Sequence, residues 1–454
     1  MPRKVVIIGG GAAGPKAAAK LRREKPDYII DLYTQENVIS YSACGLPYYV
    51  EGMIDDHRKL IVRRPDQFEK NGISVHLEQK CIKIMPDQKE VVIQDVHNGN
   101  TYNVAYDTLI IATGAKPYIP QIENVELRNV YTLRTIEDGI RIREAMLNSK
   151  KAVIVGGGYI AIELLEAFVH NHLHVTIVDV SKHIMGIFDD DMAELIQKHV
   201  ENKDGDKVDI INSDTVVKFE GEDGYVKKVI TSKGKEIEAD FVVIAAGVVP
   251  NTELLDDTDL KRGYKGTIWV DSHFLTSNPS IFAVGDCVEK RHGVTHKPCW
   301  VPLGSTANKE GRCAALNIAG QRCEFEGILG SAVTRYFGFT MSTTGITEKE
   351  AKALCYQVET ALVTKKDRAG YMPEVGNITI KLVVDKNSRE ILGAQAIGCG
   401  DADKRINAVS SAILMNTKID DFLNLDLPYA PPYSPAIDPL LNAAQIIYDK
   451  LEKS

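Results

Sequence analysis

The sequence predicts an α/β protein with two doubly wound, Rossmann-like nucleotide-binding domains, followed by a C-terminal α+β domain. Two glycine motifs, at residues 9–14 and 156–161, each follow a short apolar run and precede a helical pattern. This order of strand, glycine loop and helix is typical of a dinucleotide-binding unit. From about residue 327 the pattern changes to strands and helices that end in a proline-rich segment at 428–435. The length of 454 residues is sufficient for about three domains.

Composition excludes several classes of partner and site. A net charge of −8 disfavours nucleic acid or an anionic membrane as a partner. The first apolar run is too short for a signal peptide, and no stretch is long enough to span a membrane, so we expect a cytoplasmic protein. The eight cysteines form no CxxC pair and no even spacing. We therefore expect neither a disulfide framework nor a metal site.

The first unit begins with the apolar run Val5 to Ile8, and a helical pattern follows its glycine loop through Arg23. Free backbone amides at the helix start can receive a pyrophosphate, and the candidate residues are Gly9, Gly11 and Gly14. The next strand, Tyr28 to Tyr33, should end at an acid that binds a ribose. Thr34 stands there instead, so we assign this role to Glu36.

The segment from Ser40 to Tyr48 places Cys44 at the start of a predicted helix. The partial positive charge of a helix N-terminus favours the thiolate, which attacks sulfur. No second cysteine follows within two turns, so a redox cycle here would pass through a mixed disulfide, a persulfide or a sulfenic acid. The alternative is that Cys44 is a small buried hydrophobic residue, as an isolated cysteine more often is. Redox chemistry at Cys44 is favoured because the same chain contains two predicted nucleotide-binding units.

The second unit repeats the pattern more clearly. The strand Lys151 to Val155 leads into the glycine motif, whose candidate binding residues are Gly156, Gly158 and Ala161. The next strand, His174 to Val178, ends at Asp179. A carboxylate there accepts a hydrogen bond from a ribose 2′-hydroxyl and repels a 2′-phosphate, so NADH is favoured over NADPH. Lys182 and His183 follow closely, which keeps NADPH as the less favoured alternative.

The remaining elements are predicted from apolar runs and turn signals. An apolar strand from Tyr106 ends in Thr113-Gly114, and a β-meander over 226–237 precedes another strand that begins at Phe241. The later predicted elements are a strand before Gly285-Asp286, a helix over 304–319 and a strand over 378–384.

These features together resemble the pyridine nucleotide-disulfide oxidoreductases over essentially the whole chain. Residues 40–48 are similar to the signature of the single-cysteine branch, Ser-Phe/Tyr-x-x-Cys-Gly-x-Pro-Tyr, as in coenzyme A-disulfide reductases and NADH-dependent persulfide reductases. The resemblance implies FAD in the first unit, NAD(P)H in the second, and a homodimer with sites shared between subunits. It also implies domain limits: FAD-binding 1–118 and 250–326, NAD(P)H-binding 119–249, and dimerisation 327–454.

Several residue roles follow from the resemblance alone. It implies that Asp286 binds the flavin ribityl chain and that Tyr159 and Glu163 line the nicotinamide side of the flavin. It also assigns Thr113 and Gly114 to cofactor binding.

Two tyrosines are candidate proton donors. Oxidases and peroxidases of this branch carry a histidine in the first glycine loop, where this chain has Ala12. Coenzyme A-disulfide reductases use two tyrosines of the partner subunit, and the resemblance assigns Tyr371 and Tyr429 to that role. A phenol can protonate a leaving thiolate. The alternative is that both tyrosines only pack an interface.

A basic face is the candidate coenzyme A site. Lys16, Lys20 and Arg23 recur at helical spacing, so they share one face and suit phosphate groups. The alternative is an ordinary solvated face. The resemblance adds Ser40 and Asn308 as substrate contacts. Ala43 replaces an asparagine of the staphylococcal-type reductases, which weakens the case for coenzyme A.

The predicted function is a reductase that passes electrons from NADH through FAD to Cys44, which reduces coenzyme A disulfide, or coenzyme A and sulfane-sulfur persulfides and polysulfides. Coenzyme A is expected as substrate or as a bound mixed disulfide. The alternatives are an NADH oxidase or peroxidase and a non-catalytic redox-sensing or electron-transfer flavoprotein. A metal at His170, His172 and His174 is disfavoured because their spacing fits neither helix nor strand. Cysteines without a motif are expected to be packing thiols: Cys287, Cys299, Cys313, Cys323, Cys355 and Cys399.

Overall fold

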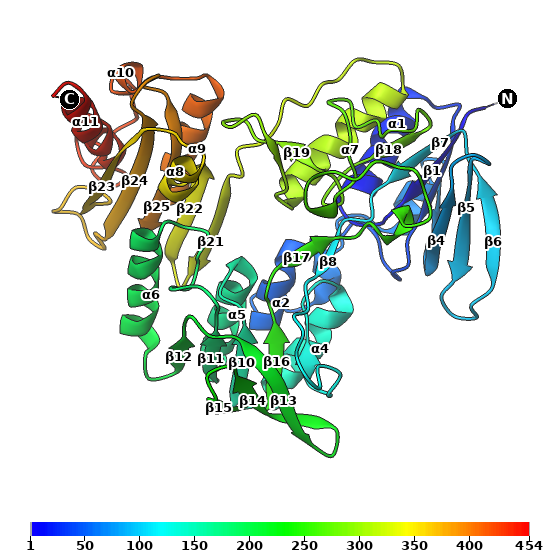
Figure 1. Ribbon diagram of the computed structural model, residues 1–454, viewed down its shortest axis with the longest axis horizontal. Helices are drawn as coiled ribbons and strands as arrows, with labels where there is room; N and C mark the ends of the chain where they lie inside the picture. The colour runs from blue at the N-terminus through cyan, green and yellow to red at the C-terminus, as the bar shows by residue number, and fades with distance from the viewer. Residues whose placement is uncertain (1, 454) are drawn as a thin grey trace.

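A five-stranded parallel sheet forms the centre of the first unit in the computed structural model, which describes residues 2–453 (Figure 1). The strand order is β18-β7-β1-β2-β3, with bounds β1 (Lys4–Ile8), β2 (Ile29–Tyr33), β3 (Ile73–His76), β7 (Thr108–Ile111) and β18 (Ile281–Ala283). One face is covered by helices α1 (Ala13–Glu24) and α7 (Gly304–Ile318), and the other by an antiparallel meander of β4 (Gln79–Met85), β5 (Glu90–Asp95) and β6 (Thr101–Ala105). Because both faces are covered, the three strands β1, β7 and β18 are nearly continuous apolar runs in the sequence.

The second unit has the same layers. Its parallel sheet has the order β12-β11-β10-β16-β9, with bounds β9 (Val130–Tyr131), β10 (Lys151–Val155), β11 (His174–Val178), β12 (Val208–Ile211) and β16 (Phe241–Ile244). One face packs against α4 (Ile136–Leu147), α5 (Tyr159–His170) and α6 (Asp190–Asp204), and the other against the meander β13 (Val216–Glu222), β14 (Tyr225–Thr231) and β15 (Glu236–Glu238). The two predicted nucleotide-binding units are therefore present as separate sheets.

The C-terminal third is an antiparallel sheet with three of its helices on one face and α8 on the other. The strand order is β21-β22-β25-β24-β23, with bounds β21 (Ala332–Tyr336), β22 (Phe339–Gly345), β23 (Val358–Lys366), β24 (Asn377–Asp385) and β25 (Ile391–Gly398). Its helices are α8 (Glu348–Ala353), α9 (Ala402–Leu414), α10 (Ile419–Phe422) and α11 (Pro439–Leu451). Helices α9, α10 and α11 share one apolar cluster with β23, β24 and β25, so this third has the predicted α+β character.

Short elements connect these parts. The chain leaves the first unit through β8 (Ala115–Pro117) and returns through β17 (Val248–Pro250), and these two strands pair antiparallel. The other short elements are α2 (Leu46–Glu51), α3 (Pro65–Glu69), β19 (Lys290–Arg291), β20 (Pro298–Cys299) and the 3₁₀ turns Ala43–Gly45, His57–Leu60, Glu253–Leu255 and Tyr264–Gly266.

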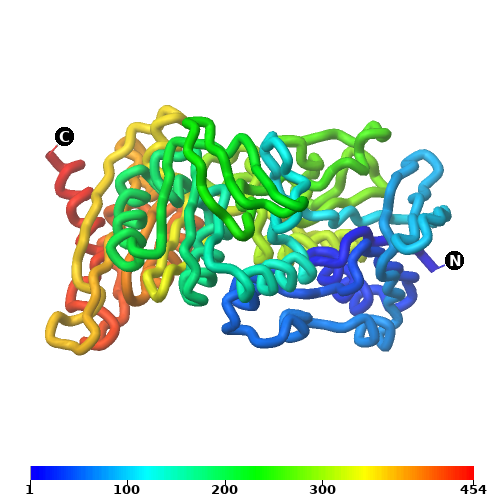
Figure 2. The backbone as a smooth tube through the Cα atoms, turned by 90° about the horizontal axis from the view of Figure 1, so that it is seen from below, coloured from blue at the N-terminus to red at the C-terminus, as the bar shows by residue number. Residues whose placement is uncertain are grey.

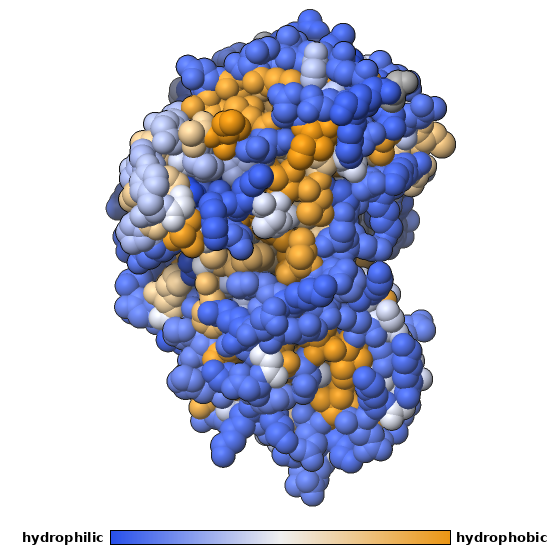
Figure 3. Space-filling view, turned by 90° about the vertical axis from the view of Figure 1, so that its left-hand side faces the viewer, coloured by the Kyte–Doolittle hydropathy of each residue, from blue (hydrophilic) through white to orange (hydrophobic). Residues whose placement is uncertain are grey.

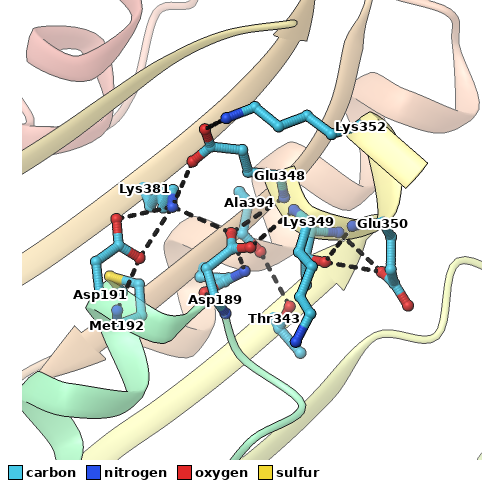
Figure 4. A network of polar contacts seen from close by, with 12 residues as sticks. Asp189, Asp191, Met192, Thr343, Glu348, Lys349, Glu350, Lys352, Lys381 and Ala394 are labelled. Carbon is cyan, nitrogen blue, oxygen red and sulfur yellow. Dashed lines mark hydrogen bonds and ion pairs between the residues drawn. The ribbon is translucent and has the colours of Figure 1, made fainter. Parts of the chain in front are cut away.

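A buried lysine joins the C-terminal sheet to the second unit (Figure 4). The Lys381 ammonium on β24 lies 2.7 Å from a Glu348 carboxylate oxygen, 2.8 Å from Asp191 and 3.3 Å from Asp189, both of which lie at the start of α6. Burial alone would lower the pKa of Lys381, but its hydrogen bonds to Asp191 and Glu348 raise it overall. Asp189 also accepts a hydrogen bond from the Gln395 amide at 2.9 Å. This network ties the two regions together.

The molecule is long, with the first unit and the C-terminal third toward opposite ends (Figure 2). Viewed from the C-terminal side, apolar residues gather on the upper part of the surface, where the C-terminal third lies (Figure 3). The exposed aliphatic side chains of that third include Val333, Leu362, Leu414, Met415, Ile437 and Ile446. Within residues 2–453, no helix combines the length and the apolar character that crossing a membrane requires.

Candidate functional site

The first glycine loop crosses the end of β7 at very short range. A Cβ at Gly9, whose φ is +123°, would lie 2.1 Å from the Ala112 carbonyl oxygen, and one at Gly14 would lie 2.1 Å from the Gly9 carbonyl oxygen. Gly11 faces open space, and Thr113 follows directly after Ala112 at the strand end, where its hydroxyl donates to the Asn251 carbonyl at 2.6 Å. Glycine is therefore required at the two close contacts, and the open side leaves room for a pyrophosphate at the start of α1.

Asp286 provides the observation that best tests whether a ligand fits this unit. Its Oδ1 atom is buried and has no hydrogen-bond partner among the described residues, while Oδ2 lies 3.9 Å from an Arg134 nitrogen. Buried polar atoms are nearly always paired in native proteins. A ligand hydroxyl, such as one on a flavin ribityl chain, would satisfy this oxygen, so the residues present fit FAD.

A buried ion pair holds the turn before Asp286. The Gly285 amide donates to a Glu310 carboxylate oxygen at 2.6 Å, and the Lys290 ammonium donates to the Gly285 carbonyl at 3.1 Å. Lys290 and Glu310 lie 3.4 Å apart with almost no exposed side-chain surface. Burial raises the pKa of Glu310 to about 7, although Lys290 opposes the shift. The pair therefore fixes the backbone from which Asp286 projects. Sequence reasoning missed it, although a charged residue on the apolar face of a helix was a signal that could have found it.

Glu36 lies near the glycine loop but already has a partner. The Tyr41 hydroxyl donates to its carboxylate at 2.7 Å, and burial raises the pKa of Glu36 although this hydrogen bond lowers it. Thr34, at the strand end, is buried, and its hydroxyl accepts from the Glu36 amide at 3.3 Å. A Cβ at Gly10 would lie 2.9 Å from that hydroxyl oxygen, so Thr34 fills the space beside the loop and Glu36 is the nearest following carboxylate.

The second glycine loop repeats the close contact of the first. A Cβ at Gly156, whose φ is +109°, would lie 2.5 Å from the Ala245 carbonyl oxygen, and Gly158 faces open space. Asp179 follows β11 directly and accepts a hydrogen bond from the Ser181 amide at 2.7 Å. Ala161 is buried in the first turn of α5. The second loop is therefore open to a nucleotide in the same way as the first.

A carboxylate of α5 faces the C-terminal sheet. The Thr334 hydroxyl on β21 donates to Glu163 at 3.1 Å. Burial raises the pKa of Glu163 to about 7; the Thr334 hydrogen bond opposes this shift, and Glu166 adds to it. The pKa of the Tyr159 hydroxyl is also raised, first by burial and second by the charge of Glu163. Thr334 is a contact that sequence reasoning missed, because it lies 171 residues from Glu163 along the chain.

Cys44 lies where the two units meet. It is the central residue of the Ala43–Gly45 turn, and the following helix α2 packs against α4 and α5 of the second unit. Cys44 is an exposed residue, and its sulfur lies 4.0 Å from the Cβ position of Gly304, the first residue of α7. Charges on Glu163, Asp286 and Arg134 all act on it. The structure thus brings Cys44 together with residues of both units.

The expectation that the helix start favours a Cys44 thiolate is wrong for this structure. The pKa of Cys44 is raised, first by loss of hydration and then by the carboxylates of Glu163 and Asp286, while Arg134 lowers it. Helix α2 has only six residues, and loss of hydration is the largest cause of the raised pKa. The packing assignment is also wrong for Cys355 and Cys399, which are exposed. All eight cysteines lie within residues 2–453 and are unpaired thiols.

The candidate substrate residues come from neighbouring elements. Lys16 and Lys20 on α1 are half-buried and Arg23 is exposed, and Lys20 forms an ion pair with Glu24. Helix α7 lies beside α1 (Figure 1). Its residue Asn308 is exposed and donates to the Gly304 carbonyl at 3.0 Å. Ser40 has a left-handed φ of +52°, and its amide donates to the Gly10 carbonyl at 2.7 Å. One charge of the basic face is therefore compensated within the chain.

Tyr371 and Tyr429 lie on two loops of the C-terminal third, with 76% and 53% of their surface exposed. The Ala369 amide donates to the Pro431 carbonyl at 3.1 Å, so the two loops lie side by side. Within residues 2–453, no hydrogen bond or ion pair joins either tyrosine to residues 40–48.

Two of the three histidines at positions 170, 172 and 174 lie close to different carboxylates. His170 lies 4.0 Å from Glu51, and His174 lies 3.6 Å from Asp209. Across residues 2–453, no group of three or more His, Cys, Asp or Glu side chains could hold a metal ion.

Comparison with known proteins identifies the family. The family described as pyridine nucleotide-disulphide oxidoreductase matches residues 3–311, and the dimerisation domain of the same family matches residues 331–440. This chain belongs to that family. The family predicted from the sequence is confirmed, and so are the predicted fold and the predicted use of FAD and NAD(P)H.

Three relatives illustrate the range of activities in the family. The chain is 36% identical over 451 residues to the NAD(P)H coenzyme A polysulfide/persulfide reductase of Pyrococcus horikoshii, covering 98% of this chain and 99% of the relative. It is 33% identical over 452 residues to an NADH oxidase of Methanocaldococcus jannaschii, covering 99% of each. The solved structure of an NAD-dependent persulfide reductase from A. fulgidus matches with a TM-score of 0.95 and 38% identity, covering 99% of this chain and 84% of that one.

Proposed function

We propose that this protein is an NADH-dependent reductase of coenzyme A disulfide, or of coenzyme A and sulfane-sulfur persulfides and polysulfides, with Cys44 as its redox residue. The observation that carries the proposal is the position of Cys44, an exposed residue at the junction of the two nucleotide-binding units. FAD, when bound, carries the electron pair of NADH to sulfur. The names of the reductase relatives support this substrate class.

The assignment of residues to the two nucleotides is part of the same proposal. We assign FAD to Gly9, Gly11, Gly14, Glu36, Thr113, Gly114 and Asp286. NADH is assigned to Gly156, Gly158, Ala161 and Asp179, with Tyr159 and Glu163 on the nicotinamide side. The corresponding domain limits are 1–118 and 250–326 for FAD, 119–249 for NADH and 327–454 for the dimerisation domain. The site of action is expected to be the cytoplasm.

The sulfur chemistry requires a nucleophile and a proton donor. The Cys44 thiolate attacks one sulfur of the substrate, the S–S bond breaks, a mixed disulfide forms and the other sulfur leaves as a thiolate. Tyr371 and Tyr429 of the partner subunit protonate that thiolate. Lys16, Lys20, Arg23, Ser40 and Asn308 orient the coenzyme A portion. An electron pair from NADH then cleaves the mixed disulfide, which releases the second thiol and restores Cys44.

The test compares two cysteine variants. Cys44→Ser should still bind FAD and accept hydride from NADH but lose disulfide and persulfide reduction, because serine is a poor nucleophile toward sulfur. Cys355→Ser, at an exposed thiol in the C-terminal third, is the matched control and should keep full activity. Intact mass with and without reductant should show thiol adducts on wild type and not on Cys44→Ser.

An NADH oxidase is the competing activity, because such an oxidase is among the relatives. Ala12, in place of a histidine, favours the reductase. NADH consumption that depends on oxygen and equals or exceeds the anaerobic rate with any disulfide or persulfide would overturn the proposal in favour of the oxidase.

A further inference from the structure

One buried arginine connects the two loops that carry the candidate tyrosines. We propose that Arg405 is a positioning residue that holds the Tyr371 loop (residues 367–376) and the Tyr429 loop (residues 423–438) as a single rigid unit. The inference rests on the proposed function, because it assigns importance to these two tyrosines. Arg405 lies on α9 and is 6% exposed.

The guanidinium of Arg405 contacts both loops at once. Its Nη2 atom donates to the backbone carbonyl of Asp367, the first residue of the Tyr371 loop, at 3.2 Å. Its Nε atom donates to both carboxylate oxygens of Asp438, the last residue of the Tyr429 loop, at 3.1 Å, and Nη2 lies 3.0 Å from Asp438 Oδ2. A planar guanidinium can make these contacts together, whereas a lysine ammonium is a single point charge.

Each contact point is also the closure of its own loop. The buried Asp367 is bonded to both backbone polar atoms of Gly376. The Asp367 amide donates to the Gly376 carbonyl at 3.1 Å, and the Asp367 carboxylate accepts a hydrogen bond from the Gly376 amide at 2.7 Å. Asp438 accepts from the Ser434 hydroxyl at 3.0 Å and caps α11 through the Leu440 amide at 2.9 Å. Arg405 is thus bonded to the residue that closes each loop.

The tyrosines depend on this backbone for their position. Both side chains are mostly exposed and make no side-chain hydrogen bond among the described residues. The direct link between the loops is the hydrogen bond from Ala369 to Pro431. Proton transfer needs heavy atoms within about 2.6–3.2 Å, so loosening either loop should reduce the rate. Asp438 would be left as a buried, unpaired charge without Arg405, which is a strongly unfavourable state.

The experiment uses the full-length holoenzyme with Arg405→Lys and, from the other side of the pair, Asp438→Asn. The matched control is Arg389→Lys. Arg389 makes a bidentate pair with Asp420, both at 2.7 Å, in the same third of the chain, but it contacts neither loop. Hydrogen exchange should become faster in both tyrosine loops of Arg405→Lys and Asp438→Asn, and in neither loop of Arg389→Lys.

Kinetics separate positioning from general damage. Arg405→Lys should lower kcat for disulfide reduction about tenfold, with a smaller change in KM, while the rate of flavin reduction by NADH stays unchanged. In the background Tyr371→Phe/Tyr429→Phe, the same substitution should cause no further loss. Unchanged exchange, exchange that rises in only one loop, or an additive loss in the double-Phe background would overturn the inference. If the double-Phe variant is itself fully active, the proton-donor assignment in the proposed function fails, and hydrogen exchange still decides whether Arg405 couples the loops.

Discussion

The two nucleotide-binding units share one architecture but satisfy their acidic residues differently. Both sheets place the strand before the glycine loop in the centre and cover one face with helices and the other with a three-stranded meander. In the first unit, a buried oxygen of Asp286 has no hydrogen-bond partner within residues 2–453. In the second, Asp179 already accepts a hydrogen bond from the Ser181 amide. The acid of the first unit therefore has an acceptor oxygen open to a ligand, whereas the acid of the second unit already has a partner within the chain.

A second difference concerns buried glutamates. Burial raises the pKa of Glu310 in the first unit and of Glu163 in the second to about 7. Glu310 is paired with the buried Lys290 side chain, whereas Glu163 accepts a hydrogen bond from the Thr334 hydroxyl. A buried glutamate is thus part of an ion pair in the first unit, whereas the buried glutamate of the second unit is an acid that accepts a hydrogen bond from a hydroxyl.

The largest expected effect comes from breaking the ion pair. Glu310→Gln should lower the free energy of unfolding at pH 8 by about 3–5 kcal/mol, because it leaves the Lys290 ammonium buried without its counter-charge. Glu163→Gln should cost far less, because Thr334 can still donate to the amide oxygen. Denaturant unfolding of both variants tests this, and similar losses would contradict the distinction between the two glutamates.

Removal of the Asp286 carboxylate should weaken the binding of FAD. Asp286→Ala should weaken FAD binding by about 10- to 100-fold, since hydrogen bonds to charged groups contribute about 1.5–3 kcal/mol. The flavin-to-protein ratio after extensive dialysis measures this. Asp179→Asn is the control and should retain full flavin content. Flavin retention by Asp286→Ala equal to wild type would show that Asp286 has no such role.

Asp179 should decide the choice between nucleotides. Wild type should be reduced faster by NADH than by NADPH, and Asp179→Ala should lower the NADH-to-NADPH ratio of kcat/KM by about tenfold, because the variant no longer repels a 2′-phosphate. Anaerobic stopped-flow reduction of the flavin gives both rates. Glu36→Ala should leave the ratio unchanged. Equal rates in the wild-type enzyme would contradict the assignment.

The smallest effect is a change in pH dependence. The folded-state pKa of Glu163, about 7, exceeds its ordinary value of 4.5, so its contribution to stability is fully present below pH 4.5 and is lost as the pH rises through 7. Glu163→Gln should therefore flatten the fall in Tm between pH 5 and 8, as thermal unfolding can show. A slope identical to that of wild type would mean that Glu163 is ionised across this range.

The sequence alone determined the parts of this protein that depend on local pattern. Apolar runs followed by glycine motifs predicted β1 and β10 with their helices, and the bounds of β10 and β11 were predicted without error. The Cys44 segment and Asp179 were recognised in the same way, because a strand end, a loop and a helix start are adjacent along the chain. A predicted strand from Tyr106 begins only at Thr108, since Asp107 turns aside to accept a hydrogen bond from the Lys4 amide.

The tertiary structure decided the environment of these residues. Thr334 reaches Glu163 from a distant strand, Lys381 joins the C-terminal sheet to α6, and Arg405 connects two loops. Each of these contacts joins residues that are far apart in the sequence. The periodicity of a helix or strand predicts which residues are buried, but it does not predict which distant residue a polar side chain will contact. The pKa of Cys44 shows the same limit: a helix start favours the thiolate locally, but burial and carboxylates from both units raise the pKa in the folded protein. Local pattern specifies which residues are present at a site, and long-range packing sets their charge state and position.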